Sequence, residues 1–164
     1  RHPERLASVK SLMKQRGTAF ALRSDGGGED VVLLDTMGEL SRLYGCADIV
    51  VMGGTLCEGV GGHDPIEAAV LGKPVLSGPF YENFKDVTER LANGGGLEVV
   101  HQPAQQLPSV LAKLIEEPEK LEQMGKKALA TVTRNAGAVD KYSRELRRLL
   151  DSSQNRQTAE RQVS

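Results

Sequence analysis

Tryptophan is absent from this 164-residue sequence, and the aromatic residues are limited to three Tyr and three Phe. The formal net charge is only −1, from 21 basic and 22 acidic residues. A chain with neither a basic excess nor aromatics interleaved with a basic patch lacks the electrostatic footprint of a nucleic-acid-binding protein. Long hydrophobic runs are also missing, and none approaches the roughly 20 residues that span a bilayer. These absences predict a soluble chain with no nucleic-acid partner.

Cysteine is scarce as well. Cys46 and Cys57 have no CxxC spacing, which excludes a zinc knuckle or a disulfide framework. Free Cys is among the most buried residue types, so we expect both to be buried, reduced thiols, as suits a reducing compartment. His2, His63 and His101 lie too far apart in the sequence to suggest ligands of one metal ion. We therefore expect no metal site.

What the sequence does contain is a series of short β-rich runs that alternate with longer helical runs. Three of the strand candidates are nearly continuous apolar runs, which is typical of strands covered on both faces. The alternation predicts an α/β fold, with a Rossmann-like parallel sheet of about five strands flanked by helices. The strands are expected at Thr18–Ser24, Val31–Asp35, Asp48–Gly54, Lys73–Gly78 and Leu97–Val100. Helices are expected at Pro3–Gln15, Gly38–Tyr44, Pro65–Leu71, Phe80–Ala92, Gln105–Glu116, Glu119–Arg134 and Ala138–Leu150.

The composition changes near the end of the chain. Residues 1–150 are expected to form one domain, which is long enough to bury a hydrophobic core. The stretch "DSSQNRQTAERQVS", residues 151–164, contains almost no apolar side chains. Such a composition is typical of disorder, so we predict a disordered polar tail.

A first candidate site follows the strand that ends at Asp35, in "DTMGEL". Thr36 stands at an N-cap position and Glu39 follows three residues later, which is the spacing of a capping box. The same turn lies at the carboxyl end of a parallel strand, where open α/β sheets bind ligands. Gly38 leaves backbone N–H groups open to an anion at a helix start. Capping and anion binding are both open interpretations of these residues.

A second candidate site follows the next strand, in "GGTLCEGVGGHDPIEA". Its many glycines allow the backbone to approach a ligand closely, and packing alone seldom needs so many. Asp64 stands at an N-cap position, Pro65 at the first helical position and Glu67 at the third. Glu58 and Glu67 bracket the loop, and a carboxylate at a helix start can accept two ribose hydroxyls. The alternatives are a second capping box for Glu67 and a satisfied loop histidine for His63, but the cluster as a whole favours a site for phosphate and ribose.

Four motifs carry a family resemblance. In this order, "RHPER", "DTMGELSRLYGCADIVVMGGTL", "GGHDPIEAAVLGKPVLSGP" and "NFKD" resemble the carboxyl-terminal half of 3-deoxy-D-manno-oct-2-ulosonic acid (Kdo) transferases. The resemblance extends from Arg1 to about Leu150, and "EAAVLGKPV" is also similar to the broader two-Rossmann (GT-B) glycosyltransferase pattern. It implies that residues 1–150 form a nucleotide-sugar-binding domain for the donor, CMP-Kdo, with no separate cofactor.

The resemblance also implies what the whole enzyme does. Members of the family are inverting glycosyltransferases that transfer Kdo to a lipid A precursor in lipopolysaccharide biosynthesis, at the cytoplasmic face of the bacterial inner membrane. Their amino-terminal half binds the lipid acceptor and carries the catalytic base, so no catalytic residue is expected within this chain.

Site residues follow from the motifs they share with the family. The implied donor-binding residues are Arg1, Thr36, Met37, Gly38, Glu39, Gly61, Gly62, His63, Asp64 and Glu67, with Asn83 and Lys85 as weaker candidates. Of these, Met37, Gly38 and Glu39 would meet the CMP phosphate and cytidine. The residues that would line the phosphate and ribose are Gly62, His63, Asp64 and Glu67.

The chain departs from the family pattern in two respects. The family usually reads "GGHNP" where this chain reads "GGHDP", so Asp64 keeps the helix cap but brings negative charge instead of an amide donor. The family's carboxyl-terminal domain begins with a strand, a helix and a strand before "RHPER". We therefore expect this chain to be a fragment that lacks the first strands of the sheet, that self-associates when prepared alone and that binds CMP weakly or not at all.

Two other functions remain open from the sequence. One is a different GT-B enzyme, a transferase or an epimerase, that uses a UDP sugar and shares "EAAVLGKPV". The other is a non-catalytic nucleotide-binding module that keeps the glycine loop without a partner domain. A comparison of CMP with UDP binding separates the two enzymes.

Overall fold

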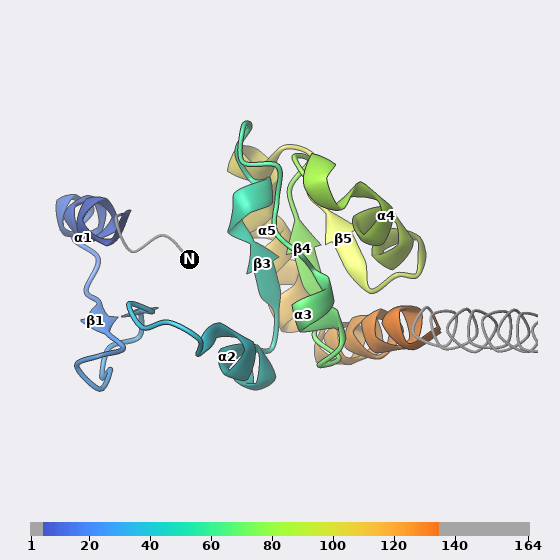
Figure 1. The fold of residues 1–164 in the computed structure, drawn as a ribbon, viewed down its shortest axis with the longest axis horizontal. Helices are drawn as coiled ribbons and strands as arrows, with labels where there is room; N and C mark the ends of the chain where they lie inside the picture. Colours follow the sequence, from blue (N-terminus) through green and yellow to red (C-terminus); the bar gives the residue numbers. More distant parts are fainter. Residues whose placement is uncertain (1–4, 135–164) are drawn as a thin grey trace, which may run out of the picture. The chain divides into compact units, whose positions relative to one another are not determined.

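The structure, a computed structural model, describes residues 5–134 and divides the chain into two compact units (Figure 1). Unit 1 comprises residues 1–46 and unit 2 comprises residues 47–164. The predicted helix Ala138–Leu150, the predicted tail 151–164 and Arg1 lie outside the described residues. Each unit is therefore treated by itself.

Unit 1 is a small α/β arrangement around a two-stranded parallel sheet. Its elements are α1 (Leu6–Gln15), β1 (Ala21–Leu22), β2 (Val32–Leu33) and α2 (Leu40–Cys46). In the sheet, Ala21 lies opposite Val32 and Leu22 opposite Leu33. None of the described residues of this unit is buried, and Leu12 is 52% exposed. Two strands without a buried face give little independent stability.

Unit 2 contains a three-stranded parallel sheet in the order β3-β4-β5, with helices packed on it (Figure 1). The strands are β3 (Val50–Met52), β4 (Val75–Ser77) and β5 (Leu97–Val99). The helices are η2 (Gly53–Thr55), α3 (Ile66–Ala69), η3 (Glu82–Phe84), α4 (Lys85–Asn93), α5 (Pro103–Glu116) and a further helix over residues 118–134.

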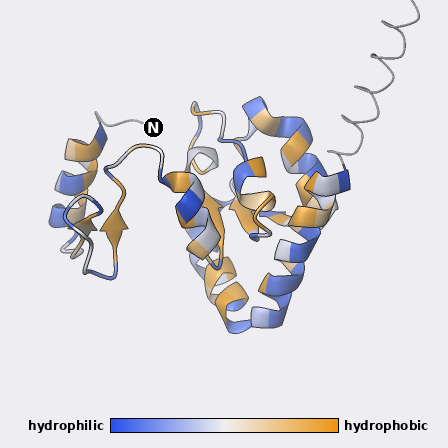
Figure 2. Cartoon of the chain, turned by 60° about the horizontal axis from the view of Figure 1, so that its bottom comes forward, coloured by the Kyte–Doolittle hydropathy of each residue, from blue (hydrophilic) through white to orange (hydrophobic). Residues whose placement is uncertain are grey.

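The hydrophobic core of the protein lies in unit 2. All three residues of β4 are buried, as expected for a central strand covered on both faces. On one face, Leu76 packs with Leu114 of α5 and Met124 of helix 118–134. Figure 2 shows the hydrophobic strands and the helices whose residues alternate between hydrophobic and hydrophilic. Periodic apolar residues on the helices therefore cover the apolar strands, and the polar side of each helix remains outside.

The predicted α/β fold class is confirmed, and each of the five predicted strands is present with parallel pairing. The strands are divided between two sheets, whereas the sequence predicted one continuous sheet. In the described part of the chain no ladder joins β1 or β2 to β3. The division coincides with the boundary between the two units at residues 46 and 47.

The prediction that both cysteines are buried is wrong. Cys46 and Cys57 are free and exposed. Cys46 ends α2, a helix that buries none of its residues, so it has no core to enter. Cys57 lies in the turn after η2, beside the exposed Glu58. The general preference of cysteine for buried positions therefore does not predict the exposure of Cys46 and Cys57, because the exposure of each depends on the element in which it lies.

Candidate functional site

The carboxyl ends of the three parallel strands of unit 2 lie at the same edge of the sheet. The glycine loop, residues 53–63, follows β3, and the segment 78–83 follows β4. Parallel pairing therefore brings the two segments together at the edge where open α/β sheets bind ligands. They are joined by a hydrogen bond of 3.1 Å from the Asn83 backbone N–H to the Gly61 carbonyl.

Three glycines of this loop lie where a Cβ would meet a neighbouring residue. A Cβ at Gly54 would collide with the His63 ring, and a Cβ at Gly61 would collide with the Asn83 side chain. At Gly62, φ is +90° and a Cβ would lie 3.1 Å from the Thr55 methyl carbon. Packing therefore accounts for Gly62, where backbone atoms of Tyr81 and Phe80 also lie close, whereas at Gly54 and Gly61 the contacts are with side chains that can rotate. The ligand role of the loop remains a prediction.

Asp64 makes the predicted side-chain bond at the start of the following helix, although α3 begins at Ile66, and Pro65, one residue later than predicted, stands at its N-cap. The backbone N–H of Ile66 donates to Oδ1 of Asp64 over 2.9 Å, which is the contact expected of an N-cap side chain. Glu67 lies half-buried in the first turn of α3, and the next two residues, Ala68 and Ala69, are fully buried. The first turn of α3 therefore holds Glu67 near the surface beside the glycine loop, while Ala68 and Ala69 of the same helix pack into the core.

The "DTMGEL" turn of unit 1 differs from the predicted capping box. The Thr36 hydroxyl donates to the Glu39 side chain, and Glu39 also lies 3.5 Å from Nε of Arg23. Helix α2 begins at Leu40, not at Gly38, because Gly38 has a left-handed φ of +81° that a right-handed helix cannot include. The prediction that Thr36 is the N-cap is wrong. Beside the turn, Met37 is 69% exposed.

Two polar residues that the sequence analysis did not single out, Ser24 and Asp35, form a clamp between the ends of β1 and β2. The Ser24 hydroxyl donates to Oδ2 of Asp35 over 2.7 Å and its backbone N–H donates to Oδ1 over 3.0 Å. These two bonds hold the pKa of Asp35 below its ordinary value, and the bond from the hydroxyl has the larger effect. The sequence did contain a signal for this clamp, because Ser24 follows β1 and Asp35 follows β2, and these two strands are parallel neighbours.

Replacement of Ser24 by Ala is expected to raise the pKa of Asp35 toward the ordinary value of a carboxyl, because it removes the hydroxyl donor. Because the pKa of Asp35 is lower in the folded than in the unfolded protein, the clamp stabilises the folded state at pH values above the unfolded pKa. This stabilisation is lost as the pH falls through the folded pKa. Carboxyl NMR titration of Asp35 in both proteins measures the shift. Identical titration curves would show that the hydroxyl bond does not persist in solution.

The site residues implied by the family motifs fall into separate groups. In unit 2, Gly61, Gly62, His63, Asp64 and Asn83 lie on the two adjoining segments, with Glu67 just beyond. Lys85 is 4.0 Å from Oε1 of Glu89, in an exposed pair on α4. The "DTMGEL" turn of unit 1 contains the other group, which is Thr36, Met37, Gly38 and Glu39. Arg1 lies outside the described residues.

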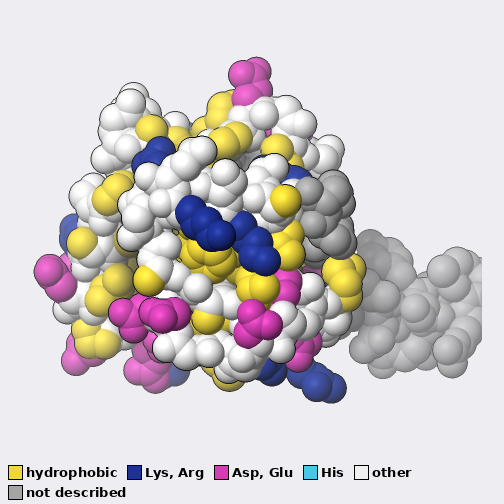
Figure 3. All heavy atoms as spheres, turned by 90° about the vertical axis from the view of Figure 1, so that its left-hand side faces the viewer, with side chains coloured by type: hydrophobic (Ala, Val, Ile, Leu, Met, Phe, Trp, Pro, Cys, Tyr) yellow, Lys and Arg dark blue, Asp and Glu magenta, His cyan; other side chains and the backbone are white. Residues whose placement is uncertain are grey.

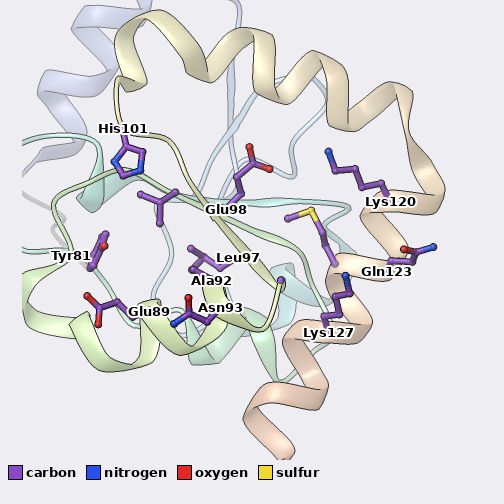
Figure 4. Close-up of a pocket in the computed structure, with 13 residues that line it drawn as sticks. Tyr81, Glu89, Ala92, Asn93, Leu97, Glu98, His101, Lys120, Gln123 and Lys127 are labelled. Carbon is purple, nitrogen blue, oxygen red and sulfur yellow. The ribbon is translucent and has the colours of Figure 1, made fainter.

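A separate hollow of about 690 Å³ lies along β5, between α4 and helix 118–134 (Figure 4). Its walls carry charges of both signs, from Glu89, Glu98, Lys120 and Lys127, while Tyr81 and His101 lie at one end. None of the residues implied by the family motifs lines it. Charged side chains beside an edge strand discourage pairing with another chain, which is a sufficient reason for their presence here.

The described residues contain no group of three or more His, Cys, Asp and Glu side chains placed to hold a metal ion. Within the same ranges, no helix combines the length and apolar character needed to cross a membrane.

Comparisons with known proteins bear on the family to which the chain belongs. Residues 23–131 match the family described as Glycosyl transferases group 1. The chain belongs to this family.

Within the family, the chain is similar to Kdo transferases over most of its length. It is 35% identical to the 3-deoxy-D-manno-octulosonic acid transferase of Bordetella pertussis over 144 residues, which are 84% of this chain and 33% of that protein. The Haemophilus influenzae transferase is 34% identical over 155 residues, covering 92% of this chain and 34% of that protein. The chain thus spans about a third of the length of the curated relatives it matches.

A solved structure supports the same relationship. The C-terminal CMP-Kdo binding domain of WaaA from Acinetobacter baumannii matches with a TM-score of 0.75 and 32% identity, over 80% of this chain and 70% of that one. The family motifs, the parallel fold and the similar structure agree. This glycosyltransferase-family chain therefore has the fold of the carboxyl-terminal domain of a GT-B enzyme.

Proposed function

We propose that this chain is the donor-binding half of a Kdo transferase and that it binds CMP-Kdo. The observation that carries the proposal is the match to a CMP-Kdo binding domain over 70% of that domain. The glycine loop supports it, because it lies at the carboxyl edge of the sheet where α/β proteins bind nucleotides. In the proposal, Gly61, Gly62 and His63 meet the donor phosphate and Glu67 holds the ribose.

The proposed reaction is a direct displacement. An acceptor hydroxyl attacks the anomeric carbon of Kdo, a base from the rest of the transferase takes its proton, and CMP leaves with the electrons of the broken bond. The part of this chain is to bind the donor and to stabilise the leaving phosphate with backbone N–H groups. The proposed acceptor is a lipid A precursor, at the cytoplasmic face of the inner membrane, and this assignment follows from the resemblance of the sequence motifs to the Kdo transferase family.

A transfer assay tests the proposed function. The full-length polypeptide that carries this chain is incubated with CMP-Kdo and a tetraacylated lipid A precursor, and the products are resolved by mass spectrometry. We expect a lipid product heavier by Kdo, together with free CMP. Release of CMP without a Kdo-bearing lipid would contradict the proposed acceptor, and no consumption of CMP-Kdo would contradict the proposed donor.

Asp64→Asn is expected to tighten CMP binding at low salt. Asn is an equally good N-cap, and it keeps an oxygen for the Ile66 N–H while it removes a negative charge beside the proposed phosphate. The gain should shrink as salt screens the site, because the Debye length is about 8 Å at physiological ionic strength. Calorimetric titration of the full-length protein with CMP at two salt concentrations measures it. Equal or weaker binding by Asp64→Asn would show that Asp64 points away from the phosphate.

We also propose that the 164-residue chain, prepared alone, self-associates. The edge strand β3 has the sequence Val50-Val51-Met52 and carries no charge, in contrast to β5, which contains Glu98 and is flanked by Lys120 and Lys127. In unit 1, Val32 of β2 is 46% exposed. Hydrophobic side chains at the surface are visible in Figure 3. Uncharged apolar edges favour pairing with another chain.

Light scattering over a concentration series tests this self-association. We expect the apparent mass to rise with concentration, and we expect Val32→Lys, which places a charge on the exposed strand β2, to lower it. The matched change on β5, Val99→Lys, should have a smaller effect because that strand already has charged neighbours. A monomer at all concentrations would contradict the proposal.

A further inference from the structure

Thr55 joins the ends of two neighbouring strands of unit 2. It is the last residue of η2, directly after β3, and only 1% of its surface is exposed. Its hydroxyl donates to the Met52 carbonyl over 2.6 Å and accepts the Gly78 N–H over 2.6 Å. One side chain therefore ties the carboxyl end of β3 to the carboxyl end of β4.

The remaining atoms of Thr55 contact the two segments that continue from these strands. Its carbonyl accepts the Phe80 N–H over 3.2 Å, which fixes the chain as it enters η3. Its methyl carbon lies 3.1 Å from the position that a Cβ would take on Gly62, so the glycine loop packs directly on it. Between the same segments runs the hydrogen bond from the Asn83 N–H to the Gly61 carbonyl. Thr55 is thus the buried junction of the glycine loop and the segment 78–83.

We propose that Thr55 is a positioning residue for donor binding, which holds the Gly61–Asp64 stretch and Asn83 in the arrangement that accepts the nucleotide. The inference rests on the proposed function. Thr55 itself is too deeply buried to touch the donor.

The physical basis is preorganisation of the loop. Glycines such as Gly61 and Gly62, with φ of +74° and +90°, leave the free loop many conformations. The apparent affinity for a ligand falls in proportion to the fraction of molecules in the binding-competent conformation. A single hydroxyl oxygen at position 55 both donates to the Met52 carbonyl and accepts from the Gly78 N–H. Ser retains this capacity, whereas Val has the shape of Thr and lacks it.

The test compares Thr55→Val and Thr55→Ser in the full-length protein, with CMP affinity measured by calorimetry well below the melting temperature of every variant. If the loss of the two bonds reduces the competent fraction to a tenth, Thr55→Val binds CMP about 10-fold more weakly. Thr55→Ser is expected to bind within about twofold of wild type, by the same relation between population and affinity. Thr88→Val is the matched control, because Thr88 is also buried but lies on α4, outside the glycine loop and the segment 78–83, and it should leave CMP affinity unchanged.

A second control separates positioning from stability. Leu114→Ala removes a buried side chain from the core cluster that it forms with Leu76 and Met124, and therefore destabilises the fold. It should lower the melting temperature without changing CMP affinity. Wild-type affinity in folded Thr55→Val, or an equal loss of affinity in folded Leu114→Ala, would overturn the positioning role.

Hydrogen exchange keeps the proposal testable if Thr55→Val does not fold. In the wild-type protein without ligand, the Gly78 amide should exchange as slowly as amides of β4, because it is bonded to a buried hydroxyl. Fast exchange of Gly78 in the absence of CMP would overturn the proposal. No CMP binding by the wild-type protein would instead contradict the proposed function, which distinguishes the two failures.

Discussion

Glu67→Gln is expected to weaken the binding of CMP-Kdo by about 1 to 3 kcal/mol, or about 5- to 150-fold, in the full-length protein. The proposed role of Glu67 is to accept two ribose hydroxyls with one carboxylate, and hydrogen bonds to a charged group are the stronger class. Gln offers only one acceptor oxygen and no charge. Calorimetric titration with CMP-Kdo, or with CMP as its stable fragment, measures the loss.

The fold should survive this substitution. Glu67 lies in the first turn of α3, whose cap is the bond from the Ile66 N–H to Asp64, and Gln also serves at the third position of a capping box. Glu119→Gln is a matched control on helix 118–134, where the same change should alter neither affinity nor stability. Unchanged donor affinity in a stable Glu67→Gln protein would reduce Glu67 to a helix-capping residue.

Gly78→Ala is expected to lower the free energy of unfolding by about 3 kcal/mol, the upper end of the usual range for overpacking. A Cβ at this position would collide with the Thr55 carbonyl oxygen and approach the Leu56 Cα to 2.9 Å. Both obstacles are backbone atoms, which cannot rotate away as a flexible side chain can. The change therefore forces β3 and β4 apart at their carboxyl ends. Urea denaturation of the two proteins measures the difference.

Gly53→Ala is the matched control for that experiment. Gly53 is the first residue of η2, where a Cβ would meet nothing within 4 Å. The stability change should stay within about 0.5 kcal/mol, as for most substitutions away from packed features. Equal losses from both variants would indicate a general effect of removing glycine from this region and would contradict the specific collision with Thr55.

Much of the fold could be predicted because hydrophobic periodicity reports burial directly. The runs around Val50, Val75 and Leu97 identified β3, β4 and β5, and the apolar spacing near Leu114 identified α5. Periodicity does not say which strand neighbours which, since any two apolar parallel strands can pair. For that reason the division of the five strands into two sheets was not predicted.

Local signals in the site had unequal value. The cap at Asp64 was predictable because one side chain and one nearby N–H settle it. The start of α2 was not, because the spacing of Thr36 and Glu39 suits both a capping box and the side-chain bond that the structure has. Thr55 was missed because its partner Gly78 lies 23 residues away, a distance at which sequence spacing carries no information.

A comparison of the affinities for CMP and UDP tests the central claim most directly. The full-length protein is titrated separately with each nucleotide under one set of conditions. A CMP-Kdo binding domain should bind CMP more tightly than UDP by at least about 10-fold, which is about 1.4 kcal/mol. Equal affinities, or tighter binding of UDP, would contradict the assignment of this chain as the donor-binding half of a Kdo transferase.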